Sequence, residues 1–253
     1  MIPEPTLDIS IVIPVYNEAQ SLLPLHAELD AALKVLGRSY EIIAIDDGSR
    51  DDSLPILKQL GEVDPHVVVI SLRRNFGQTA AFAAGFDRAR GAVVITIDAD
   101  GQNDPADIPL LLAKMAEGYD IVSGWRQNRK EPLFTRKIPS RVANAIITSN
   151  TGIYLHDSGC SLKAYQYEVI KRINLYGDMH RFIPALVKGA GFKVVEMPVS
   201  HRARRFGVSK YGLANRVFRA TADMFGVRWL LARRLDPMET RNDPARGSGL
   251  KLP

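Results

Sequence analysis

Apolar and polar positions in the first half of the chain follow two alternating patterns. Short runs rich in Val and Ile predict buried strands at residues 9–15, 40–45 and 67–72, in a run from Val93, and at residues 120–124. Apolar residues at steps of three and four predict helices at residues 21–36, 78–89 and 105–115, and another that opens at Asp51, Asp52 or Ser53. Because strands and helices alternate, we expect an α/β fold with a mostly parallel sheet, right-handed crossovers and flanking helices.

The pattern changes after Arg126. Residues 127–141 form a basic segment interrupted by prolines, and a helical pattern follows at residues 142–147. Further on, the sequence predicts a short strand ending at Tyr165, helices at residues 167–173 and 181–188, and a last strand at residues 193–199. We therefore expect one domain over residues 1–212.

Apolar residues recur at helical spacing from Leu213 to Leu235, with arginines on the opposite face and flanking the apolar seam. Three interpretations of this amphipathic helix stay open: it lies in the interface of an anionic bilayer, it packs on the domain, or it pairs with a second copy. Residues 236–253 are polar and lack aromatic side chains, which predicts a disordered tail.

Composition narrows the class of protein. A hydrophobic content of 46% is ordinary for a packed core, and the single cysteine excludes an internal disulfide. No apolar N-terminal segment resembles a signal peptide, and no run approaches the roughly 18–20 residues of a membrane-spanning helix, so we expect a cytosolic protein. The net charge of +5, concentrated in the C-terminal third, predicts an anionic partner such as phosphate, acidic lipid or nucleic acid.

Two carboxylates, Asp98 and Asp100, follow the fourth predicted strand. Side chains at i and i+2 of an extended segment point the same way, so both can face one ligand, and small Ala99 and Gly101 leave room for it. Paired carboxylates at the carboxyl end of a strand suit Mg²⁺ or Mn²⁺ carrying the phosphates of a nucleotide. The alternative is that Asp98 caps a helix and Asp100 merely turns the chain.

A second acidic cluster, residues 46–52, follows the second predicted strand. Helix capping accounts for Asp51 and Asp52 but leaves Asp46 and Asp47 for a ligand, because a carboxylate can accept hydrogen bonds from a base or a ribose. The first strand is followed by no G-x-G-x-x-G, which disfavours a dinucleotide site.

The remaining candidates have structural interpretations. Cys160 is most simply a small buried hydrophobe, because no motif pairs it with a base. Three histidines lack a shared metal-ligand spacing and are expected to be surface or structural groups: His156, His180 and His201.

Seven motifs in this order resemble the family 2 glycosyltransferases of the GT-A (Rossmann-like) fold, specifically the polyprenyl-phosphate sugar synthases typified by dolichol-phosphate mannose synthase. The motifs are PVYNE (14–18), DDGSRDDS (46–53), NFGQTAAFAAGF (75–86), DADGQNDP (98–105), SGWR (123–126), DSGCSLKAY (157–165) and RRFGVSKYG (204–212). The resemblance implies an inverting transfer of a hexose from a nucleotide sugar, of the GDP-mannose or UDP-glucose type, to a polyprenyl phosphate.

The resemblance also implies site residues. The nucleotide-sugar site would comprise Pro14, Tyr16, Glu18, Asp46, Asp47, Asp98, Ala99 and Gln102. A metal ion, Mg²⁺ or Mn²⁺, would be bound by Asp98, Asp100 and Gln102. Arg126 would stand near the donor, and the acceptor phosphate would be bound by Arg136, Arg204 and Lys210. Asp98, Asp100, Arg126 and Arg136 would be the catalytic residues.

No His or Glu is placed as an obvious general base, and a phosphate acceptor needs none because it is already anionic near neutral pH. Two other functions are compatible with parts of the sequence: transfer to a saccharide or protein hydroxyl, which needs a base, and a non-catalytic basic adaptor for membrane or nucleic acid. The intact Asp98, Asp100 and Gln102 disfavour the adaptor, and nucleic acid is not expected as a partner, because aromatic and basic residues do not interleave.

Two features depart from the family pattern. Gly101 replaces a leucine of the familiar D-A-D-L-Q, and the chain does not continue into the two transmembrane helices of many relatives. We therefore expect a peripheral protein at the inner face of the cytoplasmic membrane, held by an anionic membrane surface or by an integral-membrane partner, with a homodimer as a further possibility.

Overall fold

A computed structural model describes residues 2–126, 155–189, 191–204, 226–227 and 229, and these form a seven-stranded sheet in the order β3-β2-β1-β4-β6-β5-β7. The strands are β1 (Leu7–Val15), β2 (Tyr40–Asp46), β3 (Val67–Ser71), β4 (Gly91–Thr96), β5 (Ile121–Trp125), β6 (Lys163–Gln166) and β7 (Val194–Pro198). In the described part of the chain β6 alone runs antiparallel to its neighbours β4 and β5. The predicted mostly parallel sheet is confirmed.

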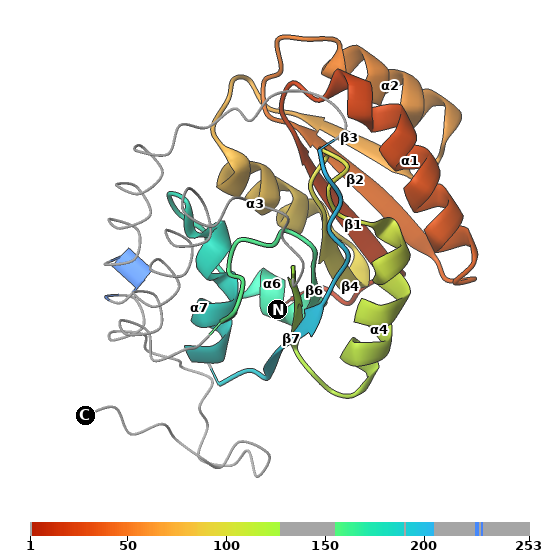
Figure 1. The fold of residues 1–253 in the computed structure, drawn as a ribbon. Helices are drawn as coiled ribbons and strands as arrows, with labels where there is room; N and C mark the ends of the chain where they lie inside the picture. The colour runs from red at the N-terminus through yellow and green to blue at the C-terminus, as the bar shows by residue number, and fades with distance from the viewer. Residues whose placement is uncertain (1, 127–154, 190, 205–225, 228, 230–253) are drawn as a thin grey trace.

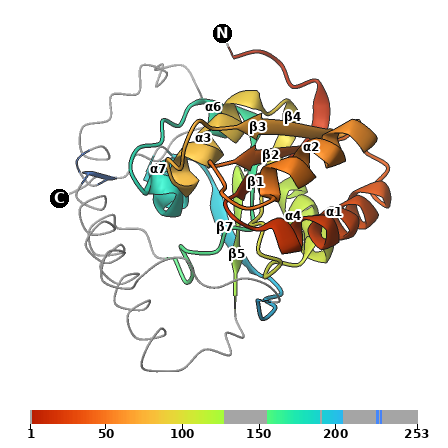
Figure 2. The same ribbon diagram turned by 90° about the horizontal axis from the view of Figure 1, so that it is seen from above.

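Helices cover both faces of the sheet. They are α1 (Ala19–Lys34), α2 (Ser53–Val63), α3 (Gln78–Arg88), the 3₁₀ turn η1 (Pro105–Asp107), α4 (Ile108–Ala116), α6 (Tyr167–Lys171), the 3₁₀ turn η3 (Met179–Phe182) and α7 (Ile183–Gly189). Figures 1 and 2 show α1 and α4 on one side of the strands and α3 and α7 on the other. The architecture is a three-layer α/β/α sandwich.

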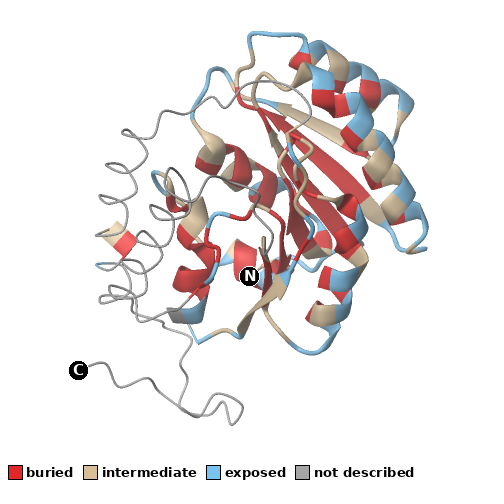
Figure 3. Ribbon diagram, viewed as in Figure 1, coloured by how far each residue is buried: buried red, intermediate tan, exposed pale blue. Residues whose placement is uncertain are grey.

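The two-residue period of the strands builds both interfaces. Ile9, Ile11 and Ile13 pack in one hydrophobic cluster with α1, α2 and α4, while Val12 joins the opposite cluster with Phe82 of α3. Figure 3 shows the result, with buried strands at the centre and exposed outer helix faces. A strand buried on both faces reads as a continuous apolar run, which is why these strands could be found in the sequence.

Strand direction decides which loops meet. Because β1, β2, β4 and β5 are parallel, the loops that follow them emerge at one edge of the sheet. The antiparallel β6 starts at that same edge, so the turn before it, residues 157–162, joins them. The segments that follow the likewise parallel β3 and β7 emerge there too, so seven chain segments converge at the carboxyl edge.

The element boundaries agree closely with those predicted from the sequence, with two corrections. The predicted helix at residues 181–188 begins earlier, as the 3₁₀ turn η3. The fourth strand ends at Thr96, and Ala99 and Asp100 lie in a turn, so the expectation of an extended segment through Asp98 and Asp100 was wrong. Ala99, between the two carboxylates, is buried.

Several predictions fall outside the described residues: the helical pattern at 142–147, the tail at 236–253 and most of the helix at 213–235. Within that last segment, Val227 is fully buried against Met179, Phe182 and Leu186, whereas Trp229 is 58% exposed. Among the residues that the structure describes, no helix has both the length and the apolar character to cross a membrane.

Candidate active site

The loop after β1 is fastened to the loop after β2. Asn17 has a left-handed backbone with φ of 52°, and its side-chain oxygen accepts the N–H of Arg50 at 2.7 Å, while its own N–H donates to Ser49 Oγ at 2.9 Å. The N–H of Ala19, the first residue of α1, donates to Asp51 of that loop at 3.1 Å, and the N–H of Glu18 donates to Ser53 Oγ, at the start of α2, at 2.8 Å. Hydrogen bonds thus hold together the two loops at the predicted nucleoside end.

Asp47 fastens a third loop, the one between β3 and α3. Its two carboxylate oxygens accept the N–H groups of Phe76 at 2.7 Å and Gly77 at 2.8 Å. Burial raises the pKa of Asp47, against the effect of these two backbone bonds. The expectation that capping leaves Asp47 without a structural task was therefore wrong, while Asp46 accepts the N–H of Ser49 at 3.3 Å. Nucleoside binding by this pair stays a prediction.

Asp98 and Asp100 lie in the turn after β4, at the centre of the edge. Asp98 accepts the side-chain N–H of Gln78 at 2.7 Å, and Asp100 accepts the guanidinium of Arg204 at 2.6 Å. Burial, and then the charge of Asp100, raises the pKa of Asp98 to about 6. Arg204 also reaches Glu18, at 3.3 Å, so it bridges the turn and the loop after β1.

Arg126, at the end of β5, is held by Asp157 in a bidentate ion pair. Its Nε and Nη2 donate to the two carboxylate oxygens at 2.6 and 2.9 Å. Burial lowers the pKa of Arg126, but the carboxylate of Asp157 outweighs that effect and the net shift is upward. A guanidinium with this fixed orientation lies close enough to Asp98 to interact with its charge.

Lys163 is a buried cation that sequence reasoning missed. Its Nζ donates to the carbonyl of Cys160 and to that of Ser158, so it ties the turn before β6 to the strand. Burial lowers its pKa. Lysine is rarely buried without partners, so the presence of a lysine within a predicted strand was the sequence signal that could have identified Lys163 as a site residue. Asp157 and Gln78 were also missed as partners, although both lie in the quoted motifs.

The structure gathers most of the predicted site residues at one edge. Partly buried Tyr16, Glu18, Asp98 and Gln102 lie there, Pro14 lies near the end of β1, and the N–H of Gln102 donates to Asp100 at 3.1 Å. Arg136 and Lys210 lie outside the described residues. Arg204, predicted for the acceptor, contacts the Asp100 carboxylate instead; its role toward a phosphate stays a prediction.

The structural interpretations of the cysteine and histidines agree with their surroundings. Cys160 is fully buried, and burial raises its pKa. His156 stacks on Trp125 with ring centroids 4.2 Å apart and bonds to Glu196, and His180 bonds to Thr79. No group of three or more potential metal-binding side chains of His, Cys, Asp or Glu occurs in the described residues.

The turn nevertheless fits a metal ion that takes its remaining oxygen ligands from the phosphates of a bound nucleotide. Asp98 and Asp100 bring two like charges together, since the charge of Asp100 raises the pKa of Asp98, and a divalent cation relieves that repulsion. Carboxylate and amide oxygens are the ligands that Mg²⁺ and Mn²⁺ prefer, and such ions are often bound by one or two carboxylates together with substrate phosphates. The donor set therefore suits a metal–diphosphate complex.

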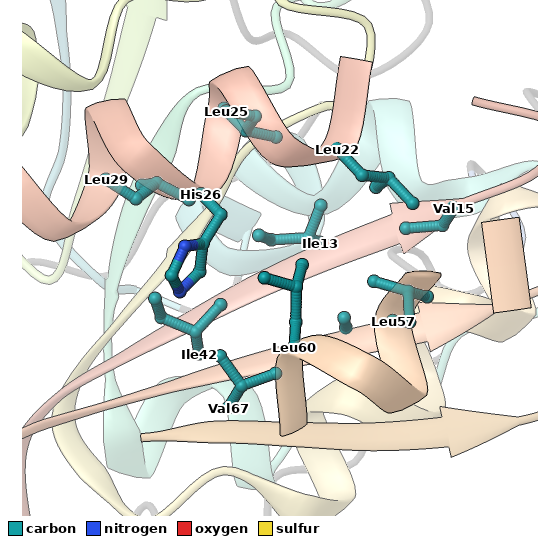
Figure 4. A pocket seen from close by; sticks show the side chains of 11 residues that line it. Ile13, Val15, Leu22, Leu25, His26, Leu29, Ile42, Leu57, Leu60 and Val67 are labelled. Atoms are coloured by element: carbon teal, nitrogen blue, oxygen red, sulfur yellow. The ribbon is translucent and has the colours of Figure 1, made fainter. Parts of the chain in front are cut away.

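An apolar pocket lies elsewhere, between α1, α2 and the strands β1 and β2 (Figure 4). Its lining belongs mostly to the hydrophobic cluster beneath these helices, and His26 on its margin bonds to Asp64 at 2.8 Å. This pocket is a gap in core packing and contributes nothing to the carboxyl edge.

The model of the family "Glycosyl transferase family 2" matches residues 10–173. The chain is 45% identical over 239 residues to dodecaprenyl-phosphate galacturonate synthase of Rhizobium johnstonii, covering 93% of this chain and 70% of that protein. It is 46% identical over 208 residues to undecaprenyl-phosphate 4-deoxy-4-formamido-L-arabinose transferase of Klebsiella pneumoniae, covering 82% of this chain and 63% of the relative.

Solved structures share the fold at low identity. A mannosyltransferase of Pyrobaculum calidifontis in complex with GDP-Man and Mn²⁺ aligns with a TM-score of 0.62 and 18% identity, over 93% of this chain and 67% of that one. Glucosyl-3-phosphoglycerate synthase of Mycobacterium tuberculosis, in complex with Mn²⁺, UDP and phosphoglyceric acid, aligns with a TM-score of 0.66 and 17% identity, over 92% of this chain and 81% of that one. These likenesses confirm the predicted GT-A fold.

Proposed function

The chain belongs to glycosyl transferase family 2 and is a glycosyltransferase, and from this premise we propose that it moves one sugar from a nucleotide sugar to a polyprenyl phosphate at the cytoplasmic face of a membrane. The names of the two relatives support this acceptor class, since each name contains a polyprenyl phosphate. The chain spans 70% and 63% of their lengths.

One observation carries the proposal: the paired carboxylates Asp98 and Asp100 lie at the carboxyl edge between two guanidinium groups. Arg126 is oriented by Asp157 on one side, and Arg204 contacts Asp100 on the other. Carboxylates suit the metal–diphosphate end of a donor, and guanidinium groups suit a phosphate acceptor. A site with both charges side by side fits a reaction that brings two phosphate compounds together.

The donor would lie along the loops after β1, β2 and β4. Pro14, Tyr16, Glu18 and the Asp46–Asp47 pair are proposed for the nucleoside, with Ala99 and Gln102 beside the diphosphate. Asp98, Asp100 and Gln102 would hold Mg²⁺ or Mn²⁺, which supplies charge stabilisation for the leaving diphosphate when bound. Solved structures of the same fold contain Mn²⁺ with GDP-Man or with UDP.

The nucleophile would be the acceptor's own phosphate oxygen, which is already ionised near neutral pH. The protein then needs to position two anions and reduce their repulsion, rather than remove a proton. Arg126, Arg136, Arg204 and Lys210 would do this. An in-line displacement at the anomeric carbon breaks its bond to the diphosphate, forms a bond to the acceptor phosphate and inverts the configuration.

A donor screen tests the proposal. Purified protein, Mn²⁺ and undecaprenyl phosphate are incubated with a panel of radiolabelled nucleotide sugars, UDP-galacturonate, UDP-glucose and GDP-mannose among them, and the label that enters the lipid phase is counted. We expect one donor to give a lipid product that disappears with EDTA. If no donor labels the lipid while a sugar hydroxyl acceptor is labelled, the proposed acceptor is wrong.

Acceptor variants refine the test. Arg136→Ala and Lys210→Ala should reduce transfer strongly while leaving nucleotide affinity nearly unchanged, because their proposed contacts are with the acceptor phosphate. An equal loss of nucleotide affinity would contradict this division between donor and acceptor residues.

A further inference from the structure

We propose that Gln78, the first residue of α3, is a positioning residue that fixes the carboxylate of Asp98 for its metal ion. This inference rests on the proposed function, because it takes the metal–diphosphate role of Asp98 as given. Neither the family relationship nor the charge pattern of the sequence assigns a role to Gln78.

The contact is direct and comes from outside the turn. The Nε2 group of Gln78 donates to Asp98 Oδ1 at 2.7 Å, across 20 residues of sequence. A hydrogen bond to one oxygen restrains rotation of the carboxylate about the Cβ–Cγ bond. Asp98 needs such a restraint because it lies beyond the end of β4, where the ladder no longer holds the backbone.

Gln78 itself is anchored on both sides. The preceding N–H, that of Gly77, donates to Asp47 at 2.8 Å, and the following side chain, Thr79, bonds through its hydroxyl to His180 Nδ1 at 2.7 Å. Three consecutive residues are thus tied to three different elements: the end of β2, the turn after β4 and η3. A side chain mounted on such a restrained helix end can hold Asp98 with little loss of entropy.

The chemistry of the amide suits the task. A neutral amide orients a carboxylate without neutralising its charge, whereas a lysine or arginine would compete with the cation. Asp100 shows the contrast, since its partner Arg204 is charged. Groups that hydrogen-bond to ligating residues typically change metal affinity or activity about 10–100-fold when they are removed.

The experiment measures binding rather than turnover. Gln78→Met keeps the length of the side chain and removes the donor, and Gln78→Ala is a second variant with high helix propensity. Gln59→Met makes the same chemical change at an exposed position of α2 and is the matched control. Each protein is titrated by calorimetry with UDP and with GDP, in MnCl₂ and separately in EDTA, and thermal melting checks the fold.

We expect the wild type and Gln59→Met to bind at least one nucleotide more tightly in MnCl₂ than in EDTA. Both Gln78 variants should lose about tenfold or more of the affinity in MnCl₂ and retain the affinity in EDTA.

Wild-type affinity in MnCl₂ for either folded Gln78 variant would overturn the inference and leave the proposed function standing. An equal loss with and without Mn²⁺ would also overturn it, since Gln78 would then contact the nucleotide or support the loop generally. If the wild type shows no Mn²⁺ effect, both the inference and the proposed metal fail.

Discussion

Asp98 and Asp100 lie two residues apart, yet groups of different charge hold them. Asp98 accepts a neutral amide from Gln78, whereas Asp100 accepts a guanidinium from Arg204, a residue 104 positions away in sequence. The cationic partner already occupies one oxygen of Asp100. The proposed metal–diphosphate complex would compete with Arg204 for this oxygen, and a phosphate would be a suitable replacement anion for the guanidinium.

Replacing Asp100 tests this residue most simply. Asp100→Ala should reduce transfer by at least about 100-fold and weaken nucleotide-sugar binding in Mn²⁺, because one of two proposed carboxylate ligands is lost. Thermal melting should change little, because Arg204 retains Glu18. Near-normal turnover of this variant in the presence of a chelator would show that the metal assignment is wrong.

Gly48 lies where the loop after β2 approaches the backbone of the loop after β3 closely. A Cβ atom at this position would lie 2.5 Å from the backbone carbon of Arg74, and φ is +67°. Gly48→Ala should therefore cost about 1–2 kcal/mol for the left-handed backbone and about 1–3 kcal/mol more for the overlap. The affinity of the Gly48→Ala variant for nucleotide should also fall.

Gly37→Ala is the matched control, because Gly37 also has a positive φ, +59°, but no atom lies within 4 Å of the added Cβ. Urea unfolding of both variants separates backbone strain from overlap. Equal destabilisation of the two would contradict the close approach of the loops.

At the scale of elements, the sequence predicts strands and helices well because their periods differ and each strand is buried on both faces. The direction of β6 was not predictable, since a run of four residues carries no signal of direction. That direction brings residues 157–162 to the site. The partners of Asp47, Asp98 and Lys163 were likewise missed, because they depend on which loops the sheet brings together.

The segment around Val227 links the C-terminal part of the chain to η3 and α7. Val227→Ala should lower stability by about 2 kcal/mol, because it removes two buried methyl groups and leaves a cavity. Trp229→Ser should leave the melting temperature nearly unchanged, because that side chain is 58% exposed.

Flotation with anionic liposomes separates the two positions further. If this segment contacts lipid, which is one of the three interpretations of its sequence, Trp229→Ser should reduce flotation at low salt, whereas flotation of folded Val227→Ala should be retained. Wild-type protein that does not float at any salt concentration would point to packing or pairing as the role of the helix.

At the scale of the whole molecule, the reactivity of the buried Cys160 thiol measures how readily the domain unfolds. Burial raises the pKa of its thiol in the folded state, so the unfolded chain releases this proton at lower pH than the native one. The contribution of Cys160 to stability is therefore present below the unfolded pKa of about 8.5 and is lost as pH rises above it.

We expect a thiol reagent to label the native protein slowly and the urea-unfolded protein rapidly. Between pH 8 and 10 the wild type should lose more free energy of unfolding than Cys160→Ala. Rapid labelling of the folded protein, or identical pH profiles of the two proteins, would contradict the buried thiol.

The central claim is that a phosphate oxygen, rather than a hydroxyl, attacks the donor sugar. The direct measurement is mass spectrometry of the lipid product when undecaprenyl phosphate and undecaprenol compete in one reaction with Mn²⁺ and the preferred nucleotide sugar. We predict a product that contains one sugar joined through one phosphate, with undecaprenol unmodified. A sugar attached to undecaprenol, at a yield equal to or above that on the phosphate, would contradict the account.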